Sequence, residues 1–174
     1  MPVLPFGARM KRAPLIALMT VTIVADQITK HFARLTLAYA PPKHYGVLSL
    51  LYAENSGAFL SLGATLPQQT RSLIFSGLVA VALLAGLWAL MTNRIEARGD
   101  AIAVAFILGG GFGNLIDRVA RGGRVSDFLY LALGPLHTGV FNVADIAITG
   151  GVIWLLMSWM FVARKATADD VSSS

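Results

Sequence analysis

Apolar residues gather in four long runs along the chain, separated by polar and charged connections. The longest uninterrupted run covers residues 72–92, which hold no charge between Arg71 and Asn93. A helix needs about 20 apolar residues to cross the ~30 Å hydrocarbon core of a bilayer. This run is therefore predicted to form a membrane-spanning helix.

Aspartates interrupt the other three apolar runs. These runs cover residues 13–25, 101–116 and 146–163, and they adjoin Asp26, Asp100 with Asp117, and Asp145. At ~1.5 Å per residue each run is somewhat short for a bilayer, so each helix must extend past its aspartate and hold it near a membrane surface. We therefore expect four spanning helices, at about residues 13–38, 70–92, 100–118 and 140–163.

The alternating direction of these helices brings acidic residues together. The first and third helices end, and the fourth begins, on the same side, so Asp26, Asp117 and Asp145 gather there. Glu54 and Asp127 lie in connections on that side too. The other acidic residues lie opposite, in polar connections or the tail: Glu96, Asp100, Asp169 and Asp170. An ionisable group at membrane depth costs at least ~2.5–3.5 kcal/mol, so the cluster indicates either mutual ion pairing or a function.

Two connections between the helices have the pattern of short strands. Pro41 and Pro42 end the first helical pattern, and residues 46–62 form two apolar segments around residues 54–57, which predicts a hairpin on the membrane surface. A basic turn at 121–124 precedes a strand-like segment at 125–133. The predicted fold class is an all-α membrane protein of four transmembrane helices, with a small β-hairpin or sheet and an interfacial loop.

The composition agrees with lipid as the surrounding solvent. Of the 174 residues, 56% are hydrophobic and 13% are charged, and the mean hydropathy is +0.68. Soluble domains carry roughly a quarter charged residues, so this chain has too little polar surface for a water-soluble globule and is too apolar for solvated disorder. The length fits a single domain over residues 1–174.

Cysteine, histidine and charge exclude several kinds of site. The absence of cysteine excludes disulfides, thiolate nucleophiles, thiolate metal sites and a thioether lipid anchor on this chain. His31, His44 and His137 are far apart in the sequence, so no zinc site is expected. The net charge of +5 comes from basic residues that flank apolar runs, which favours anionic lipid headgroups over nucleic acid as partners.

The first run has an alternative interpretation as a secretory signal peptide. Basic residues precede it, and Ala38-Tyr39-Ala40 resembles a cleavage site. The polar stretch that begins at Asp26 separates that site from the apolar core by more than a signal peptide allows, so we expect a helix. Counted over both sides of the predicted helices, basic residues are equal in number and leave the orientation open; the cluster from Arg9 to Arg12 favours termini in the cytoplasm.

Several polar residues have a structural interpretation beside a functional one. Asp26 and Lys30 are four residues apart on one helix face, and Asp117 adjoins Arg118, so each aspartate has a cation close by for an ion pair. Asn114 and Arg118 share a helix face, where they either hold a polar ligand or complete the packing of a bundle.

Two further motifs in the third and fourth helices also allow two interpretations. The spacing of Gly109 and Gly113 favours close packing of helices, and it is not a phosphate loop because the lysine such a loop needs does not follow. Asn142 and Asp145 are three residues apart at the start of the fourth helix, where Asn142 either caps the helix or contributes to a site.

Asp127 lies in an apolar stretch and needs a partner. Two carboxylates in a partly dry site share a proton, one acting as base toward water and the other as acid toward a carbonyl, which favours aspartic hydrolysis. Ser56 and Ser126 have no histidine or lysine at a suitable spacing to act as a serine nucleophile's base. A proton-conducting transporter is an alternative, although its carboxylates would extend through the whole bilayer depth. A structural membrane partner would explain Gly109 and Gly113 but not the asparagine and aspartate motifs.

Five short motifs resemble, in order, those of the lipoprotein signal peptidase family, signal peptidase II. They are DQITK at 26–30, NSGAF at 55–59, GGFGNLIDR at 110–118, VSDF at 125–128 and FNVAD at 141–145. Each motif alone is weak. Their order within a four-helix pattern makes the resemblance specific.

This resemblance implies an aspartyl endopeptidase of the bacterial inner membrane. Such an enzyme removes the signal peptide of a diacylglyceryl-modified prolipoprotein by cutting just before the lipidated cysteine, and its site and hairpin lie on the periplasmic side. It would work without metal or cofactor, as a monomer with both termini in the cytoplasm. Its partners would be lipidated prolipoproteins and membrane lipids.

The resemblance also implies roles for ten residues of this sequence. The catalytic pair would be Asp127 and Asp145. The substrate-binding residues would be Asn55, Gly57, Asn114, Arg118 and Asn142. Asp26, Lys30 and Asp117 would support the geometry of the site.

Overall fold

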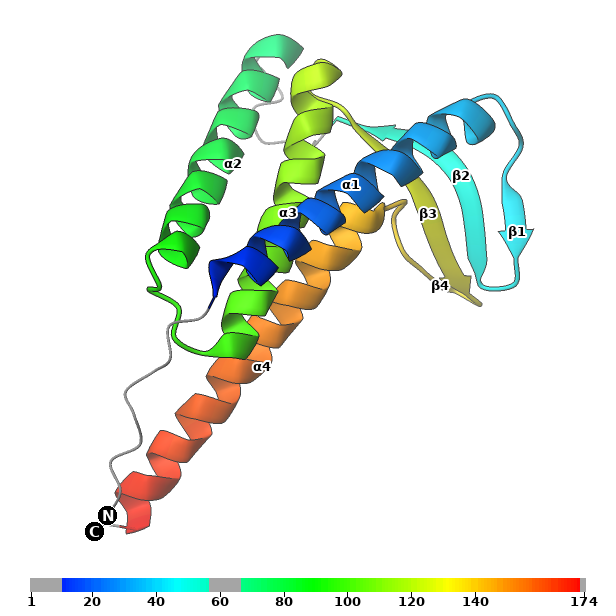
Figure 1. Cartoon of the computed structure of the whole chain (residues 1–174). Helices are drawn as coiled ribbons and strands as arrows, with labels where there is room; N and C mark the ends of the chain where they lie inside the picture. Colours follow the sequence, from blue (N-terminus) through cyan, green and yellow to red (C-terminus); the bar gives the residue numbers. More distant parts are fainter. Residues whose placement is uncertain (1–10, 57–66, 173–174) are drawn as a thin grey trace.

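The computed structural model describes residues 11–56 and 67–172 (Figure 1). Within these residues the helices are α1 (Arg12–Leu37), α2 (Gln68–Met91), α3 (Arg98–Ala120) and α4 (Val143–Ser172). The strands are β1 (Lys43–Tyr45), β2 (Leu48–Asn55), β3 (Val125–Leu133) and β4 (Leu136–His137). A helix forms at each of the four predicted positions, although α4 continues well past the predicted end at residue 163 because no glycine or proline follows Gly151 before its end.

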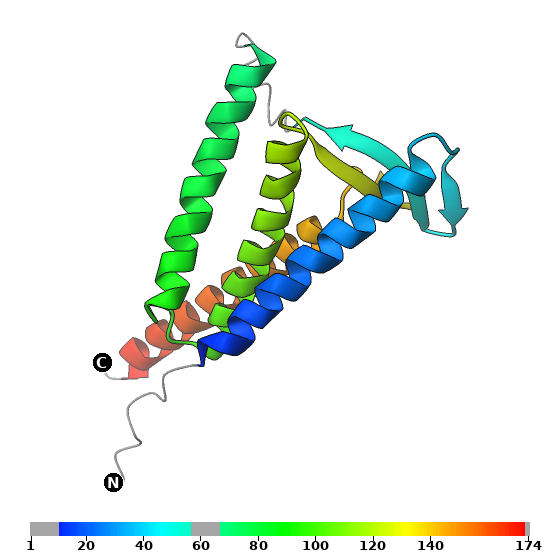
Figure 2. The ribbon, with the colours of Figure 1, turned by 45° about the horizontal axis from the view of Figure 1, so that its top comes forward.

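α3 lies at the centre of the helical part and packs against α1, α2 and α4 (Figures 1 and 2). Among the described residues, α1, α3 and the Val143–Phe161 part of α4 are long and apolar enough to cross a membrane. The apolar part of α2 within these residues is the shorter stretch Ser76–Met91. The prediction of membrane-crossing helices is thus confirmed for three of the four runs by length and composition.

Polarity in the helical part is distributed opposite to that of a soluble protein. Large apolar side chains are exposed on the outer faces, as with Leu73 on α2 and Trp159 on α4. In contrast, Asp26 and Lys30 of α1 are fully buried. Exposed apolar and buried charged residues are the arrangement expected where the helices are surrounded by hydrocarbon.

Glycines of α3 allow its neighbours to approach closely. A Cβ atom added at Gly109 would lie 2.8 Å from the Cβ of Thr22, and one added at Gly113 would lie 2.6 Å from Oδ2 of Asp26. An added Cβ at Gly110 would overlap the carbonyl oxygen of Ala144 on α4. The predicted role of this glycine motif in close helix packing is confirmed, and the packing sets Asp26 directly against α3.

A small antiparallel sheet in the order β1-β2-β3-β4 lies beside the C-terminal half of α1 (Figure 2). β3 occupies the predicted strand segment, and its start pairs with the end of β2, so that Asp127 lies opposite Ala53. Phe128 packs with Ala33 and Leu37 of α1 in a buried apolar cluster. The sheet therefore presents the first residues of β3 to the ends of α1 and α3.

The first segment of the predicted hairpin around residues 54–57 is β2, which continues to Asn55. Another hairpin, which the sequence analysis does not predict, has its turn at residues 46–47, between β1 and β2. Gly46 has a φ of 64°, a left-handed conformation that glycine adopts without strain and that suits a two-residue turn. The second strand of the predicted hairpin lies outside the described residues.

Candidate active site

Asn142 and Asp145 cap the start of α4 reciprocally. The Asp145 N–H donates to Oδ1 of Asn142 at 3.0 Å, and the Asn142 N–H donates to Oδ2 of Asp145 at 3.1 Å. These bonds satisfy amide groups that the first turn of a helix leaves without partners. The capping interpretation of Asn142 is confirmed, and the cap also fixes the carboxylate of Asp145.

The same asparagine reaches the aspartate of β3. Nδ2 of Asn142 donates to Oδ1 of Asp127 at 2.6 Å. Asn142 is fully buried and Asp127 is 2% exposed. One asparagine thus hydrogen-bonds to both carboxylates of the predicted catalytic pair. It caps α4 and contacts the predicted site at the same time.

Asn114 of α3 also hydrogen-bonds to Asp145 and Asn142. Its Nδ2 donates to Oδ1 of Asp145 at 2.9 Å, while its Oδ1 accepts from Nζ of Lys30 at 2.8 Å and from Nδ2 of Asn142 at 3.2 Å. An ammonium group only donates hydrogen bonds, so Lys30 holds the amide oxygen of Asn114 toward itself and turns the NH₂ group toward Asp145.

Two further aspartates hold the backbone next to the pair. Asp26 pairs with Lys30 at 2.8 Å, as the sequence predicts, and its Oδ1 accepts from the N–H of Ala144 at 3.0 Å. Oδ2 of Asp117 accepts from the N–H of Ser126 at 2.9 Å. Ala144 immediately precedes Asp145, and Ser126 immediately precedes Asp127. Each of these buried aspartates therefore fixes the residue before one member of the pair.

The predicted pairing of Asp117 with Arg118 is wrong. Asp117 lies 3.6 Å from both Nζ of Lys30 and Nη1 of Arg34. Consecutive side chains on a helix diverge, whereas α1 crosses α3 at the face that carries Asp117. Arg118 is partly buried and interacts electrostatically with Asp145, Asp127 and, without forming an ion pair, with Asp117.

Arg34 of α1 contacts the site although the sequence analysis assigns it no role. Nη1 of Arg34 donates to Oγ of Ser126 at 3.2 Å. The spacing of Asp26, Lys30 and Arg34, four residues apart each time, places all three on one face of α1 and is the signal that identifies Arg34.

Glu54 is a second residue without a predicted role. Its carboxylate accepts from Nη1 of Arg124 at 2.8 Å, from Nη2 of Arg121 at 3.2 Å and from the hydroxyl of Tyr52 at 3.1 Å. The bond from Arg124 is the main reason that the pKa of Glu54 is below its usual range. No sequence spacing indicates these contacts, because the arginines lie in the turn between α3 and β3.

Asn55 follows Glu54 at the end of β2 and hydrogen-bonds to Asp127. Gly57, the other predicted binding residue of this motif, lies outside the described residues. The remaining predicted site residues all converge where the C-terminal part of α1, the end of α3, the start of β3 and the start of α4 meet. The predicted gathering of Asp26, Asp117, Asp127 and Asp145 on one side is confirmed.

The pKa of Asp127 is raised to about 6, first because burial disfavours its charge. The nearby charge of Asp145 raises this pKa further, while hydrogen bonds from Asn142 and Asn55 and the charge of Lys30 lower it. Near neutral pH the carboxyl of Asp127 is therefore able both to hold and to release a proton. This property suits a general acid–base group.

Comparison with known proteins agrees with this arrangement. A family model described as signal peptidase (SPase) II matches residues 18–161, which include all five motifs. The chain belongs to the signal peptidase II family. It is thus a peptidase, and its apolar helices make it a bacterial membrane protein.

Relatives in the family cover most of the chain. The lipoprotein signal peptidase of Sphingopyxis alaskensis is 38% identical over 160 residues, which are 88% of this chain and 89% of the relative. That of Syntrophus aciditrophicus is 34% identical over 152 residues, or 85% of this chain and 94% of the relative. The resemblance of the sequence to this family is confirmed.

Solved structures share the fold. Two described as bacterial membrane enzyme structures obtained by the in meso method, at 1.9 and 2.3 Å resolution, have TM-scores of 0.74 and 0.73 and 22% sequence identity. The first match covers 88% of this chain and 97% of the solved chain, and the second covers 89% and 92%. At this identity the match supports the architecture alone.

Proposed function

We propose that this signal peptidase II family member is an aspartic endopeptidase of the bacterial inner membrane. It removes the signal peptide of diacylglyceryl-modified prolipoproteins by cutting just before the lipidated cysteine. Relatives named lipoprotein signal peptidases support the substrate class. The observation that carries the proposed chemistry is the position of Asn142, which hydrogen-bonds Asp127 at 2.6 Å and Asp145 at 3.1 Å.

The proposed reaction uses one proton shared by the pair and one water molecule. Asp127, whose pKa is raised to about 6, holds the proton, and the carboxylate of Asp145 removes a proton from the water as its oxygen attacks the scissile carbonyl. The proton of Asp127 passes to the carbonyl oxygen. When the C–N bond breaks, the leaving nitrogen takes the proton from Asp145, and the hydroxyl proton of the tetrahedral species returns to Asp127.

The predicted binding residues divide into two roles in this proposal. Asn114 and Asn142 are buried and hydrogen-bond to the carboxylates, so they position the pair. Asn55 is exposed and Arg118 is partly exposed, so these two are placed to contact the substrate backbone or lipid headgroup. Gly57 remains a predicted binding residue, and Asp26, Lys30 and Asp117 support the backbone around the pair.

The proposed orientation places the carboxylate pair toward the periplasm and both termini in the cytoplasm. We further propose that the protein has four spanning helices in a single domain and acts as a monomer. The cluster from Arg9 to Arg12 before the first helix supports the proposed orientation, because positive residues are enriched on the cytoplasmic side of membrane proteins and the first helix often sets the orientation.

Cleavage of a lipidated prolipoprotein by the purified enzyme in proteoliposomes tests the function. Asp127→Asn and Asp145→Asn should each lower the rate by about 10²–10⁴-fold, the range that a general acid–base group contributes. Glu96→Gln is the matched control, since it makes the same chemical change at an exposed position between α2 and α3. Near-normal turnover by either aspartate variant, with the control active, would refute the assignment of the pair.

A further inference from the structure

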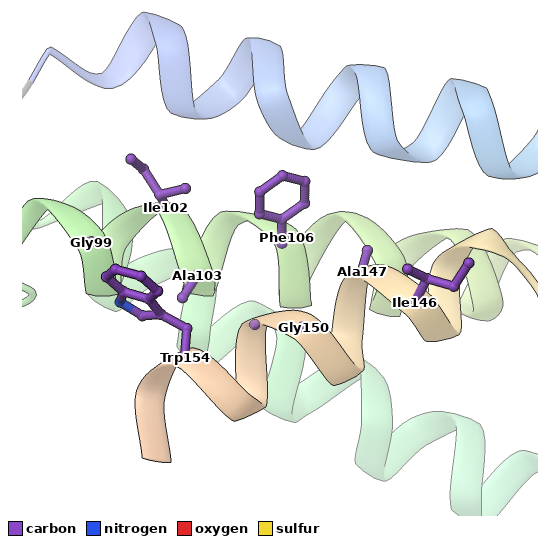
Figure 3. Close-up of a pocket in the computed structure, with 9 residues that line it drawn as sticks. Gly99, Ile102, Ala103, Phe106, Ile146, Ala147, Gly150 and Trp154 are labelled. Atoms are coloured by element: carbon purple, nitrogen blue, oxygen red, sulfur yellow. The ribbon is translucent and has the colours of Figure 1, made fainter. Parts of the chain in front are cut away.

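An apolar groove of about 480 Å³ lies between α3 and α4 (Figure 3). Its lining includes Ile102 and Phe106 of α3 and Ala147, Gly150 and Trp154 of α4. In Figure 3 the side chains of Ile102, Phe106 and Trp154 lie on the side of the α3–α4 pair that faces α1. The groove lies within the parts of both helices that are long and apolar enough to cross a membrane.

Most of the groove lies on another face of α4 than Asp145. At 100° per residue, Ala147, Gly150 and Trp154 lie roughly 140–200° around α4 from Asp145, whereas Ile146, at one end of the groove, directly follows Asp145 and lies about 100° from it. Asp145 itself hydrogen-bonds to Asn114 of α3. The experiment below therefore distinguishes a membrane lipid from an acyl chain of the substrate.

The dimensions of the groove favour a flexible chain over a helix. From Ile146 to Trp154 it extends over eight residues, or about 12 Å at ~1.5 Å per residue. The volume then corresponds to a cross-section of about 40 Å², roughly half that of a helix about 10 Å wide. At roughly 30 Å³ for each group the size of a water molecule, the groove holds about sixteen such groups, which leaves room for a segment of a flexible acyl chain.

The charges at one end of the groove indicate which lipid fits. Arg98 is exposed and immediately precedes the groove residue Gly99. Nε1 of Trp154 donates to Oδ1 of Asp100 at 3.2 Å, so one negative charge also lies at this end of the groove. Among the described residues, the start of α1 and the connection to α3 carry more basic than acidic side chains: Lys11, Arg12, Arg94 and Arg98 against Glu96 and Asp100. A phosphate group at this end would be electrostatically favoured.

We propose that the groove binds one acyl chain of an anionic phospholipid of the membrane, with the headgroup near Arg98. The bound chain covers apolar side chains of α3 and α4 that line the groove beside the contact between these two helices. The site is separate from the proposed peptidase activity. Its test therefore measures binding alone, and its failure is independent of whether the chain cleaves prolipoproteins.

Quenching of Trp154 fluorescence by brominated phospholipids tests the proposal directly. A Trp88→Phe/Trp159→Phe variant in phosphatidylcholine vesicles retains Trp154 as the reporter. Acyl-brominated phosphatidylglycerol should quench it at about a tenfold lower mole fraction than acyl-brominated phosphatidylcholine. Trp159, which is 71% exposed, serves as the internal control in a Trp88→Phe/Trp154→Phe variant and should respond equally to both lipids.

Two glycines provide a matched pair of substitutions. An added Cβ meets nothing within 4 Å at either Gly150 in the groove or Gly77 on α2. Gly150→Leu fills the groove and should abolish the tenfold preference of Trp154 for phosphatidylglycerol, whereas Gly77→Leu should leave it unchanged. Arg98→Gln leaves the groove open and should reduce the preference to about twofold, which keeps the test available if Gly150→Leu does not fold.

Three results would overturn the proposal. Equal quenching of Trp154 by both lipids would mean that the groove selects no anionic lipid. If neither lipid quenched Trp154, and if this protection increased with the protein-to-lipid ratio, the groove would be occupied by a second copy of the chain. Release of brominated phosphatidylglycerol when prolipoprotein is added to an Asp127→Asn variant would assign it to substrate acyl chains.

Discussion

At the residue scale, the four aspartates of the site, of which all but the partly exposed Asp145 are buried, are held in different ways. Asp26, Asp117 and Asp145 each accept a hydrogen bond from a backbone amide. Asp127 accepts from the side chains of Asn142 and Asn55 and is nearly inaccessible to solvent. The cost of its charge explains why the pKa of Asp127 is raised and why this residue is the proposed proton holder.

Asp127→Asn should stabilise the protein at alkaline pH. The folded-state pKa of Asp127, about 6, is above the ordinary value of 3.8, so the folded protein binds a proton that the unfolded chain releases between these values. The contribution of protonated Asp127 to the free energy of unfolding is fully present below about pH 4 and is lost as the pH rises to about 6. The asparagine variant avoids this loss, which is about 3 kcal/mol at most.

Thermal unfolding in detergent checks this expectation. The melting temperature of Asp127→Asn should exceed that of the parent protein at pH 8, and the two should converge near pH 4. A melting temperature for the variant below that of the parent at pH 8 would contradict the account of Asp127.

Glu54→Gln should slow prolipoprotein cleavage by about fivefold without abolishing it. Glu54 ties the end of β2 to the turn before β3 through Arg121 and Arg124, and the adjacent Asn55 contacts Asp127. If Glu54 acts by holding Asn55, then Glu54→Gln should have no further effect in an Asn55→Ala background. Single-turnover rates of the two single variants and the double variant check this, and fully additive losses would show that Glu54 acts by another route.

Only part of the site could be predicted at this scale. The motifs identify Asp127 and Asp145, and helical spacing predicts the pair of Asp26 with Lys30. The contact of Asn142 with Asp127 depends on where β3 places its first residues, which no local spacing encodes. For the same reason the sequence favours Arg118, the chain neighbour of Asp117, as its partner, although two cations of α1 lie across the helix contact.

At the element scale, the site forms where secondary structures begin or end. The first turn of α4 supplies Asn142 and Asp145, the last turns of α3 supply Asn114 and Asp117, and β3 supplies Asp127 near its start. The aspartates that interrupt apolar runs made these helix ends predictable. The pairing of β1 with β2 was not predictable, because the apolar pattern of β2 has no feature that marks the turn at Gly46.

Gly113→Ala should damage the site through the contact between α1 and α3. The added methyl group would lie 2.6 Å from Oδ2 of Asp26, the oxygen that pairs with Lys30, so α1 must shift away. Such overpacking typically costs about 1–3 kcal/mol. We expect a lower melting temperature and a several-fold lower cleavage rate.

Gly77→Ala is the matched control, since an added Cβ there meets nothing within 4 Å and alanine favours a helix over glycine. Its melting temperature should equal or exceed that of the parent. If Gly113→Ala behaved in the same way, the close approach of α1 to α3 would not matter for the site.

At the scale of the whole molecule, a few charged side chains are buried among the helices, whereas many large apolar side chains are exposed on their outer faces. The ion pair of Asp26 and Lys30 is fully buried and connects through Asn114 to Asp145. A buried network of this kind is costly unless each member is paired, and here each contact also fixes the position of a neighbouring group. The composition predicts the membrane environment, whereas the connections within the network required the three-dimensional structure.

The central claim is that Asp127 and Asp145 act as one catalytic unit on one water molecule. A double-mutant cycle of single-turnover prolipoprotein cleavage tests it most directly. Groups that act as a unit give strongly non-additive losses, so Asp127→Asn/Asp145→Asn should be no slower than the slower single variant. Losses that add fully in the double variant, or a single variant that keeps the parent rate, would contradict the claim.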